Sequence, residues 1–595
     1  MAQSVWRQNR RSMMSYQAPY KDMQWLVEQA YQTQQLGNLE SLQDFDLDLA
    51  NAIIDEANKF ASGVLAPLNM VGDVEGCTFS DGQVATPSGW KDAYAQFRDS
   101  GWIGLALPEE YGGQGLPKYI AQPVNEMWLS SNLAFVMFAA LAQGGSEILL
   151  KFGSDELKAR YLTQIVTGEW TVAMALTEPN AGSDLGALTT KAIPQTDGTY
   201  QIKGQKIYIT YGEHDMAENI VHLVLARTPD APAGSRGLSL FAVPKYRVNE
   251  DGSCGEFNDI RCTGIEHKTG LHGSPTCSIS YGDNDACVGE LIGNLNQGLM
   301  AMFVLMNEAR LSCGMQGVGL SEMAFQKALQ YSQERLQGAG SDGQRVAIIE
   351  HPDVKRMLLN LRSESFALRS LGYQIAALID VAEQSKDAET AQAAEKRIAL
   401  LTPIFKGFAT EQANELVGDA IQVYGGMGFV EETGIAQVMR DVRITTIYEG
   451  TTGIQAKDLL HRKIRMDQGR CISELMADIR DVVEKSPDSV VNQRLGQVLN
   501  QLAHVLDSTI LNPSAELAQL DAVAVPFLNA LGGICCAWQL AELALQAQVS
   551  KAQDEVFFGN VVALAEFYSA YKLPQAQAAL TTVIEEQNGV GNYEF

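Results

Sequence analysis

The segment TIYEGTTGIQ, residues 446–455, places one carboxylate, Glu449, beside the expected start of a helix. Thr452 and Gln455 fit the S/T-x-x-Q capping box, so a helix is predicted from about Gly453. One interpretation makes Glu449 a charge near the helix N-terminus, where the helix dipole stabilises an anion by typically ~0.3–1 kcal/mol. The other makes it a general base, because the apolar residues before it would desolvate the carboxylate and raise its basicity. The spacing alone leaves both interpretations open.

Other short motifs in the chain offer less chemistry. The glycine-rich stretches that begin at Gly113 and Gly426 lack the third glycine of a dinucleotide-binding fingerprint, and no Gly-Lys dipeptide offers a P-loop. The histidines and cysteines of the β-rich region lack the spacing of a zinc site. We therefore expect no metal, and neither a nicotinamide-binding Rossmann enzyme nor an NTPase.

The composition is that of an acidic globular protein. The 595 residues are enough for more than one core, 46% of them are apolar, and 71 Asp and Glu against 44 Lys and Arg give a formal charge of −27. This charge disfavours non-specific binding to nucleic acid or anionic lipid. A ligand that carries phosphate must therefore be held by local arginines or backbone N–H groups.

Three features favour a cytoplasmic protein without a membrane span. The nine cysteines include no C-x-x-C pair, which favours reduced thiols. Residues 1–21 are basic but lack the apolar run of a secretory signal. The most apolar long stretch, residues 522–545, contains Pro526 and Glu542, which favours a buried helix over one that spans a membrane.

Hydrophobic periodicity predicts an α+β protein in four parts. Residues 1–168 carry apolar residues at helical spacing and are expected to form an N-terminal helical domain. Residues 169–297 change to short β-branched runs separated by turn residues, as in a small antiparallel β domain. Helical patterns return in residues 298–466 with lengths that suit a four-helix bundle. They continue in residues 467–595 as an additional helical domain.

Several segments resemble a known family, the flavin-dependent acyl-CoA dehydrogenases, whose cofactor is FAD. They are, in the family's order between Leu107 and Gln455, LPEEYGGQG, ALTEPNAGSD, GQKIYIT, NEAR, QERLQG, QVYGGMGFVEE and MRDVRITTIYEGTTGIQ. The resemblance implies the family's fold, in which a β-barrel domain lies between the N-terminal helices and the four-helix bundle. It also implies an enzyme.

The resemblance gives Glu449 a role, the removal of the α-proton of an acyl-CoA while the β-hydride passes to flavin N5. It implies that the backbone N–H of this glutamate and a flavin ribityl hydroxyl form an oxyanion hole for the thioester oxygen. Gly450 would let the backbone approach the thioester. Tyr448 resembles the aromatic residue that lies beside the acyl chain.

The resemblance also implies the residues that hold FAD. Leu176 and Thr177 would meet the isoalloxazine edge, and Ser183 would reach flavin phosphate or CoA. Tyr208 and Thr210 would lie against the flavin, although many members have tryptophan at the place of Tyr208.

A second set of residues is implied to contact FAD across a dimer. Arg335 resembles the arginine that reaches the pyrophosphate of a neighbouring subunit's flavin, although Gly338 stands where the family has an aromatic residue. Gln422, Gly425 and Gly426 would contact the adenosine half of that flavin. Thr451 matches a flavin contact of the family.

CoA contacts are implied for three further residues. Asn307 and Arg310 of the NEAR segment would lie near CoA, although the family often has aspartate at the place of Asn307. Ser274 would touch the pantetheine arm. Residues 212–237 and the C-terminal helices most resemble a long-form bacterial subgroup that includes 3-methylmercaptopropionyl-CoA dehydrogenases.

In such long forms the C-terminal domain takes the place of a second dimer, so a homodimer is expected. Electrons would pass to an electron-transfer flavoprotein, in a reaction of fatty acid β-oxidation or of a related acyl group. Medium, long and methylthio-substituted acyl chains all stay open. Two alternatives on the same fold are an acyl-CoA oxidase that uses O2 and a non-enzymatic, DNA-binding flavoprotein, and the negative charge disfavours the latter.

Overall fold

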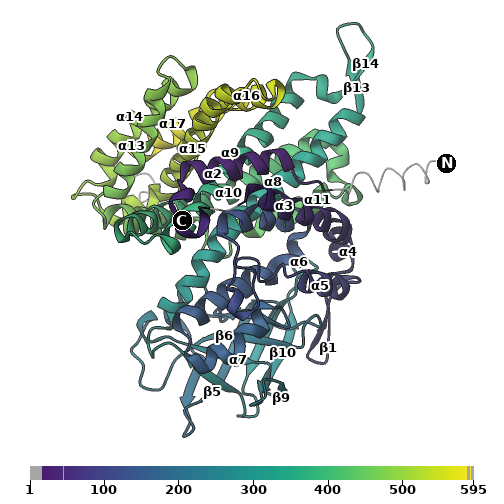
Figure 1. Cartoon of the computed structure of the whole chain (residues 1–595), viewed down its shortest axis with the longest axis vertical. Helices are drawn as coiled ribbons and strands as arrows, with labels where there is room; N and C mark the ends of the chain where they lie inside the picture. Colours follow the sequence, from purple (N-terminus) through teal and green to yellow (C-terminus); the bar gives the residue numbers. More distant parts are fainter. Residues whose placement is uncertain (1–15, 44–45, 586–589, 591–595) are drawn as a thin grey trace, which may run out of the picture. The chain divides into compact units, whose positions relative to one another are not determined.

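The computed structural model describes residues 16–43, 46–585 and 590, so the basic N-terminal stretch falls largely outside the described residues. The chain divides into two compact units, which are described separately. The helical unit comprises residues up to 58, 118–130 and 313–595, and the β unit comprises residues 59–117 and 131–312. The N-terminal helices are therefore shared between the two units. The predicted order of helical, β and helical regions is confirmed (Figure 1).

The β unit contains most of the strands. Its helices are α4 (Ala66–Glu75), α5 (Trp90–Asp99), α7 (Asp155–Val166) and the second part of α6 (Lys118–Phe152). Its strands are β1 (Thr78–Ser80), β2 (Gln83–Ala85), β3 (Trp170–Ala175), β4 (Lys191–Pro194), β5 (Tyr200–Thr210), β6 (Asn219–Ala226), β7 (Ser239–Pro244), β8 (Tyr246–Val248), β9 (Cys254–Phe257), β10 (Ile260–Ile265), β11 (Thr276–Tyr281) and β12 (Val288–Ile292).

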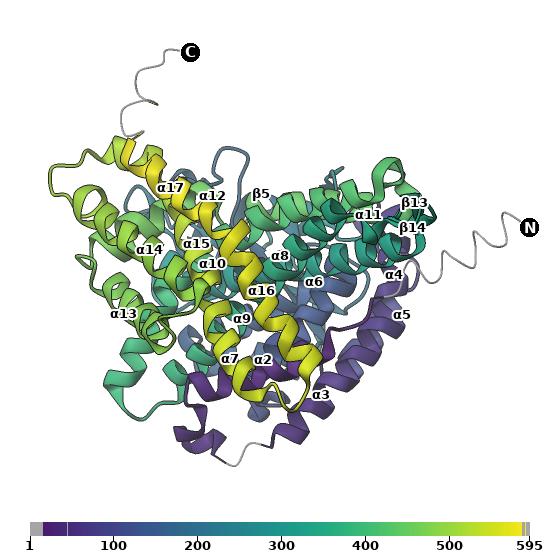
Figure 2. The same ribbon diagram turned by 90° about the horizontal axis from the view of Figure 1, so that it is seen from above.

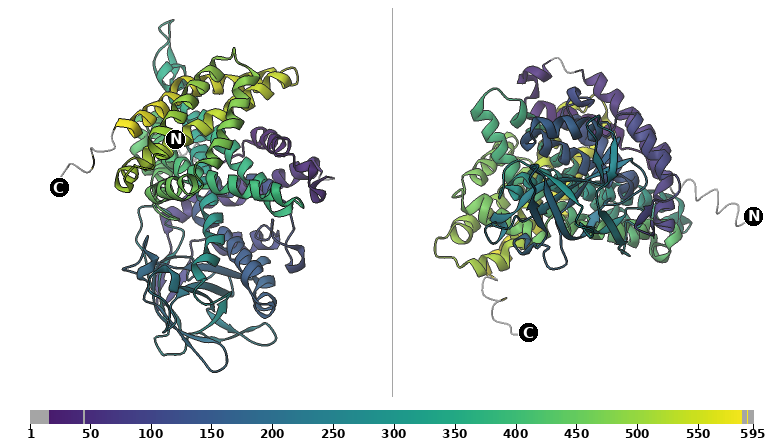
Figure 3. Two further views of the ribbon diagram at one scale, coloured as in Figure 1. Left: turned by 90° about the vertical axis from the view of Figure 1, so that its left-hand side faces the viewer. Right: turned by 90° about the horizontal axis from the view of Figure 1, so that it is seen from below.

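The main sheet of this unit has eight strands in the order β10-β11-β5-β12-β7-β6-β3, with β4 paired to β5. Its strands are the blue and teal arrows in Figure 3. All its pairs are antiparallel except β3 with β6, which run parallel from the pair Trp170–Asn219. The purely antiparallel domain that was predicted therefore has one exception. The two strands are joined through β4, β5 and the intervening loops, a connection long enough for a parallel pair.

The core of the β unit is made of alternate residues from these strands. Ile202 and Ile209 of β5, Phe241 of β7 and Ile279 of β11 are all buried in one cluster. Strand β6 is buried along its whole length, and its residues are apolar except Asn219 and His222. β5 is buried only at Ile202, Lys206 and Ile209, and its other residues are half-buried or exposed.

The helical unit contains the bundle and the C-terminal helices. Its helices are α2 (Tyr20–Thr33), α3 (Leu47–Phe60), α8 (Gly298–Glu334), α9 (Pro352–Gln384), α10 (Ala388–Tyr424), α11 (Ile435–Val442), α12 (Thr452–Lys457), α13 (Arg470–Lys485), α14 (Val490–Val505), α15 (Leu517–Ser550), α16 (Glu555–Tyr571) and α17 (Leu573–Glu585). A small hairpin, β13 (Leu336–Ala339) and β14 (Arg345–Ala347), follows α8. The boundaries between the units cut through three helices, because residues 59–60 of α3, 131–152 of α6 and 298–312 of α8 belong to the β unit.

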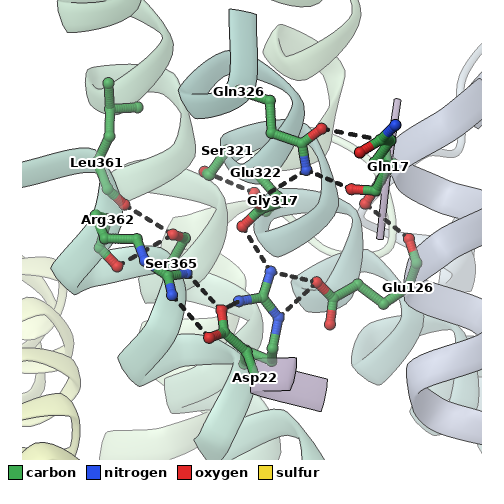
Figure 4. Close-up of polar contacts among 12 residues, drawn as sticks. Gln17, Asp22, Glu126, Gly317, Ser321, Glu322, Gln326, Leu361, Arg362 and Ser365 are labelled. Carbon is green, nitrogen blue, oxygen red and sulfur yellow. Dashed lines mark hydrogen bonds and ion pairs between the residues drawn. The ribbon is translucent and has the colours of Figure 1, made fainter. Parts of the chain in front are cut away.

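A buried charge cluster joins four helices of this unit (Figure 4). Arg369 of α9 lies 2.7 Å from Glu126 of α6 and 2.8 Å from Glu322 of α8, and all three side chains are buried. Arg362, two turns earlier in the same helix, lies 2.6 Å from Asp22 of α2. Removing one partner of such a pair typically costs ~3–5 kcal/mol, so these contacts hold the N-terminal helix to the bundle.

The C-terminal helices are packed tightly against the bundle. Gly532 of α15 lies so close to Phe408 of α10 that a Cβ atom at this glycine would be 2.1 Å from the ring. Reciprocally, a Cβ atom at Gly407 would lie 2.7 Å from Leu528. Figure 2 shows α16 and α17 beside α15, with which both helices are in contact.

A polar contact also joins the C-terminal helices to the bundle. Lys572 lies between α16 and α17 and donates to Gln412 of α10 at 2.6 Å. It also lies 3.2 Å from Glu364 of α9, and both charged groups are buried. The predicted additional domain is thus part of one compact unit with the bundle.

Two helices of the described residues, α6 and α15, are long and apolar enough to cross a membrane by length and composition. Of the most apolar window of α15, 72% is buried inside the protein, and of that of α6, 67%. Burial of this extent is typical of core helices of a globular protein, which pass the same test.

Candidate active site

Glu449 lies in a strained turn between a helical turn that ends at Thr446 and helix α12. Its φ angle is 56°, in the left-handed region that non-glycine residues rarely adopt. The next residue, Gly450, has a φ angle of 88°. Residues held in such conformations cost about 1–3 kcal/mol and are concentrated at functional sites.

Side chains from two helices hold this turn. Gln455 Nε2 donates to the carbonyl oxygen of Glu449 at 3.0 Å. Lys406 Nζ, from the middle of α10, donates to the carbonyl oxygen of Gly450 at 2.6 Å. Consecutive peptide groups of the turn are therefore each fixed by a side chain.

The helix cap lies one residue before the predicted position. Thr451 is the N-cap of α12, and its hydroxyl accepts from the N–H of Ile454 at 3.3 Å. The Thr452 hydroxyl donates instead to Glu411 of α10 at 2.5 Å. No capping box forms, because the side-chain amide of Gln455 donates to the carbonyl oxygen of Glu449 and does not accept from an N–H group at the helix start.

Burial dominates the electrostatics around the turn. Burial raises the pKa of the Cys313 thiol to about 12, and the Glu449 carboxylate adds to this while the Lys406 ammonium opposes it. Burial, Cys313 and Glu449 likewise raise the pKa of Tyr448 well above its ordinary value, and its hydroxyl donates to Gln316. Cys313 and Tyr448 are therefore neutral neighbours of Glu449.

In the β unit, the loop after β3 is fixed to strand β5. The carbonyl oxygen of Leu176 accepts from Lys206 Nζ at 2.9 Å, and that of Thr177 accepts from the N–H of Ile207 at 2.9 Å. Lys206 also lies 2.9 Å from the carboxylate of Glu178, and both side chains are buried. This ion pair determines the path of the loop.

The carboxylate of Glu178 organises the rest of that loop. It accepts from the N–H and hydroxyl groups of Thr189 and Thr190, at 2.6–3.0 Å. Burial raises its pKa, but Lys206 and these hydrogen bonds outweigh burial and lower the pKa to about 2. Burial lowers the pKa of Lys206 to about 8 despite its carboxylate partner.

Tyr208 and Thr210 lie at the end of β5 beside this loop. Tyr208 is 60% exposed and has a left-handed φ angle of 60°. Thr210 pairs with Thr276 of β11, which lies two residues after the buried Ser274. The register of β5 and β11 shifts between Lys206 and Ile209, so Tyr208 lies in an irregularity of the pair with its ring exposed.

The remaining predicted residues of the β unit are spread more widely. Ser183 is exposed in the loop, next to Asp184, whose carboxylate accepts from the N–H of Gly186 at 3.0 Å. Asn307 and Arg310 lie one helical turn apart on α8, with Asn307 exposed and Arg310 buried. The loop after β3 and the end of β5 bring Leu176, Thr177, Tyr208 and Thr210 together, with Ser183 further along the same loop, whereas Asn307 and Arg310 lie on α8.

The residues predicted to contact a neighbouring subunit's FAD gather at one end of the bundle. The rings of Tyr331 and Tyr424 stack with their centroids 4.2 Å apart, which places the ends of α8 and α10 together. Arg335 follows Tyr331 by one turn, and Gln422, Gly425 and Gly426 surround Tyr424; all four are exposed. Lys406 and Gln422 are separated by about 24 Å along α10, at 1.5 Å per residue. This cluster is therefore well separated from Glu449 within one chain.

Sequence reasoning missed the residues that hold the predicted ones. Lys406, Lys206 and Glu178 were not among the candidates, yet each holds a candidate segment. One signal was present, because Lys406 interrupts the apolar run LLTPIFKGFA of a helix whose neighbouring residues are buried. Over the described part of the chain, no group of three or more His, Cys, Asp or Glu side chains is arranged to hold a metal ion.

Comparison with known proteins identifies the family. The models of the N-terminal, middle and C-terminal domains of acyl-CoA dehydrogenase match residues 49–169, 173–283 and 296–464. A fourth model, described as acetyl-CoA dehydrogenase C-terminal like, matches residues 475–591. These matches follow one another along nearly the whole chain.

Individual relatives agree with these models. The chain is 42% identical to the 3-methylmercaptopropionyl-CoA dehydrogenase of Ruegeria pomeroyi, over 95% of this chain and 97% of that protein. It is 34% identical to a butyryl-CoA dehydrogenase of Syntrophomonas wolfei, over 93% of this chain and 94% of that protein. The solved structure of an acyl-CoA dehydrogenase with FAD from Bacillus anthracis has a TM-score of 0.69 at 21% identity, covering 93% of this chain and 90% of that chain.

The fold and the site thus define a flavin-dependent oxidoreductase of three domains with a C-terminal extension. The chain belongs to the acyl-CoA dehydrogenase family. It is an enzyme of this class, and its cofactor is FAD.

Proposed function

We propose that the protein oxidises the Cα–Cβ bond of an acyl-CoA thioester, with Glu449 as the base that accepts the α-proton. The observation that carries this proposal is the left-handed conformation of Glu449, which is held from both sides by Gln455 and Lys406. A charge that only interacts with the dipole of α12 needs no such strain, so this conformation favours the base over the dipole interpretation.

The chain's residues would act in the following way. The Glu449 carboxylate takes the α-proton, and the negative charge that develops on the thioester oxygen is stabilised by the backbone N–H of Glu449. When bound, FAD supplies the two-electron acceptor for the hydride that leaves the β-carbon. Gly450 has no side chain to obstruct the thioester, and Tyr448 lies beside the acyl chain. Positioned base catalysis of this kind typically supplies ~10²–10⁴-fold in rate.

FAD would be held by the two clusters described above. The fixed loop of Leu176 and Thr177 and the strand end with Tyr208 and Thr210 would receive the isoalloxazine ring, and Ser183 the phosphate. Thr451 would contact the flavin from the catalytic turn. Ser274, Asn307 and Arg310 would contact CoA.

The cluster of Arg335, Gln422, Gly425 and Gly426 would serve the FAD of a partner in a homodimer. Its separation of about 24 Å from Lys406 along α10 supports a role outside the chain's own site. Near it in sequence, Phe429 is 94% exposed and Leu336 and Met439 are also exposed, as expected for a surface covered by another subunit. A homodimer predicts that Phe429→Lys shifts the mass in solution toward the monomer and releases FAD.

The substrate we propose is a short, unbranched acyl-CoA. The support is the similarity to relatives named for 3-methylmercaptopropionyl-CoA and butyryl-CoA. We further propose that electrons pass to an electron-transfer flavoprotein in the cytoplasm, as part of acyl-group oxidation. The discriminating measurement is turnover under air, without an acceptor, against turnover with an electron-transfer flavoprotein; rapid turnover with O2 alone would favour an oxidase.

The decisive test is anaerobic titration of the purified FAD enzyme with a panel of acyl-CoAs, from 3-methylmercaptopropionyl and butyryl to palmitoyl. We expect the short members to bleach the flavin absorbance. If none of the panel reduces the flavin, the dehydrogenase proposal fails.

The variant Glu449→Gln tests the base directly. It should bind FAD and acyl-CoA as the wild type does, because the amide is nearly isosteric with the carboxylate. Its flavin reduction should slow by at least ~10²-fold, because no group remains to take the α-proton. Normal reduction in this variant would return Glu449 to a structural role.

A further inference from the structure

Lys406 is a completely buried lysine in the middle of α10. Its Nζ atom donates to the carbonyl oxygen of Gly450 at 2.6 Å, a short bond of the kind that charged donors make. Removing an ammonium from water is costly, and a neutral residue would fill the same place in a helix packed on all sides. The position of Lys406 therefore calls for a reason beyond packing.

We propose that Lys406 is a positioning residue for Glu449, which fixes the backbone of the catalytic turn and places a positive charge beside the proton acceptor. This inference rests on the proposed function and deepens it. Nothing in the similarity to known proteins assigns a role to this lysine. Its effect is exerted through the Gly450 peptide and through its charge, so it is not itself a catalytic residue.

The first part of the role is geometric. A peptide group is planar, so a fixed carbonyl oxygen also fixes the direction of the N–H group on the opposite side. Lys406 fixes the peptide after Gly450, and Gln455 fixes the peptide after Glu449. Together they hold two successive residues with positive φ, which a free turn would relax.

The second part of the role is electrostatic. The Cys313 thiol of α8 is influenced by both the Lys406 ammonium and the Glu449 carboxylate, which places all three in one neighbourhood. The other titratable groups there are Tyr448, which is influenced by Cys313, Glu449 and Asp441 of α11, and Glu411 of α10, which accepts from Thr452. Cys313 and Tyr448 are neutral, and Glu411 and Asp441 are acidic. Lys406 thus supplies positive charge to a largely acidic surrounding, which favours the ionised carboxylate.

The variant Lys406→Met keeps the length and burial of the side chain but removes the hydrogen bond and the charge. We expect FAD content and the affinity for an acyl-CoA to stay within about threefold of the wild type, while the rate constant of flavin reduction falls at least about 30-fold. The acid limb of the pH profile of that rate should move to higher pH by about one unit, because the ionised base has lost its positive neighbour. A purely structural role would lower the rate constant of flavin reduction without moving the acid limb of its pH profile.

The variant Lys406→Gln separates the two parts of the role. Its amide can donate to the Gly450 carbonyl without a charge, so it should recover part of the rate and keep the displaced acid limb. It also replaces Lys406→Met if that variant does not fold, as judged by circular dichroism and FAD content. An unmoved acid limb in the folded variant overturns the electrostatic part, and an unchanged rate overturns the proposal as a whole.

Lys572→Met is the matched control, because Lys572 is another buried lysine that donates to α10. It should lower the melting temperature without moving the acid limb. Flavin reduction of the wild-type enzyme distinguishes a failure of this inference from a failure of the proposed function. If wild-type flavin is not reduced by any acyl-CoA, the proposed function fails first; if it is reduced and Lys406→Met behaves like the wild type, the inference alone fails.

Discussion

At the scale of single residues, Gly450 is the position of the Glu449 turn at which a side chain is least acceptable. Its φ angle of 88° is one that glycine adopts readily and other residues rarely adopt. A Cβ atom at this position would lie 2.5 Å from Nε2 of Gln455. That amide is the group that holds the carbonyl oxygen of Glu449. A side chain at residue 450 would therefore strain the backbone and displace its support at the same time.

We expect Gly450→Ala to slow flavin reduction by roughly 10- to 100-fold, since backbone strain of about 1–3 kcal/mol would be added to the turn. FAD content should be unchanged. Stopped-flow reduction by an acyl-CoA measures the effect. Gly453→Ala is the control, because a Cβ atom there meets only the Thr451 hydroxyl at 3.9 Å; an equal loss in both variants would mean that α12 as a whole had been disturbed.

The residues themselves predicted only part of this site. The spacing around Glu449 predicted a helix start within one residue, because capping is a local interaction. The contact of Lys406 with Gly450 joins residues 44 positions apart and depends on how α10 packs, which no local pattern encodes. The same reason hid Lys206 and Glu178, which meet across 28 positions.

At the scale of elements, strand β6 and the loop before it bury two histidines, each hydrogen-bonded to a hydroxyl group. His222 on β6 is hydrogen-bonded to the Tyr281 hydroxyl at 2.7 Å, and His214 to the Thr171 hydroxyl at 2.8 Å. Burial, reinforced by the nearby Lys245, lowers the pKa of each to about 3. Both are neutral in the folded protein near neutral pH.

These histidines should make the β unit sensitive to acid. In the unfolded chain they protonate near pH 6.5, so below that pH the unfolded state binds more protons and the free energy of unfolding falls. Between pH 6.5 and 5.0 the loss is about 2 kcal/mol per histidine at 1.36 kcal/mol per pH unit. Scanning calorimetry of the FAD enzyme should show a falling melting temperature over this range. The variant His214→Gln/His222→Gln should flatten the fall, and an unchanged slope would assign it to other groups.

Elements were predicted more reliably than their pairing. The change near residue 169 from helical periodicity to short β-branched runs predicted the β region, which begins with β3 at Trp170. The parallel pairing of β3 with β6 was missed, since a run of apolar residues does not show which strand will lie beside it. The Arg369 cluster was missed too, because its members come from four helices distant in sequence.

At the scale of the whole molecule, the C-terminal helices are a structural part of the helical unit. Gly532 and Gly407 allow α15 and α10 to approach until ring and backbone touch. The apolar composition of α15 predicted its burial, but the sequence could not show that α10 would be the partner.

Gly532→Leu should separate α15 from α10 and lower the melting temperature of the helical unit, because overpacking typically costs about 1–3 kcal/mol or more. Thermal unfolding followed by circular dichroism measures the change. Gly559→Leu on α16 is the matched control, because a Cβ atom there has no neighbour within 4 Å. Equal shifts in both variants would contradict a specific contact at Gly532.

The neighbouring positions of Lys406 and Gly407 link the C-terminal helices to the turn of Glu449. Lys406 holds the carbonyl oxygen of Gly450, and at Gly407 a Cβ atom would lie 2.7 Å from Leu528 of α15. Deletion of the C-terminal helices would therefore open a void on α10 one residue from the side chain that holds this turn. The C-terminal helices thus support the turn indirectly, through the packing of a single helix.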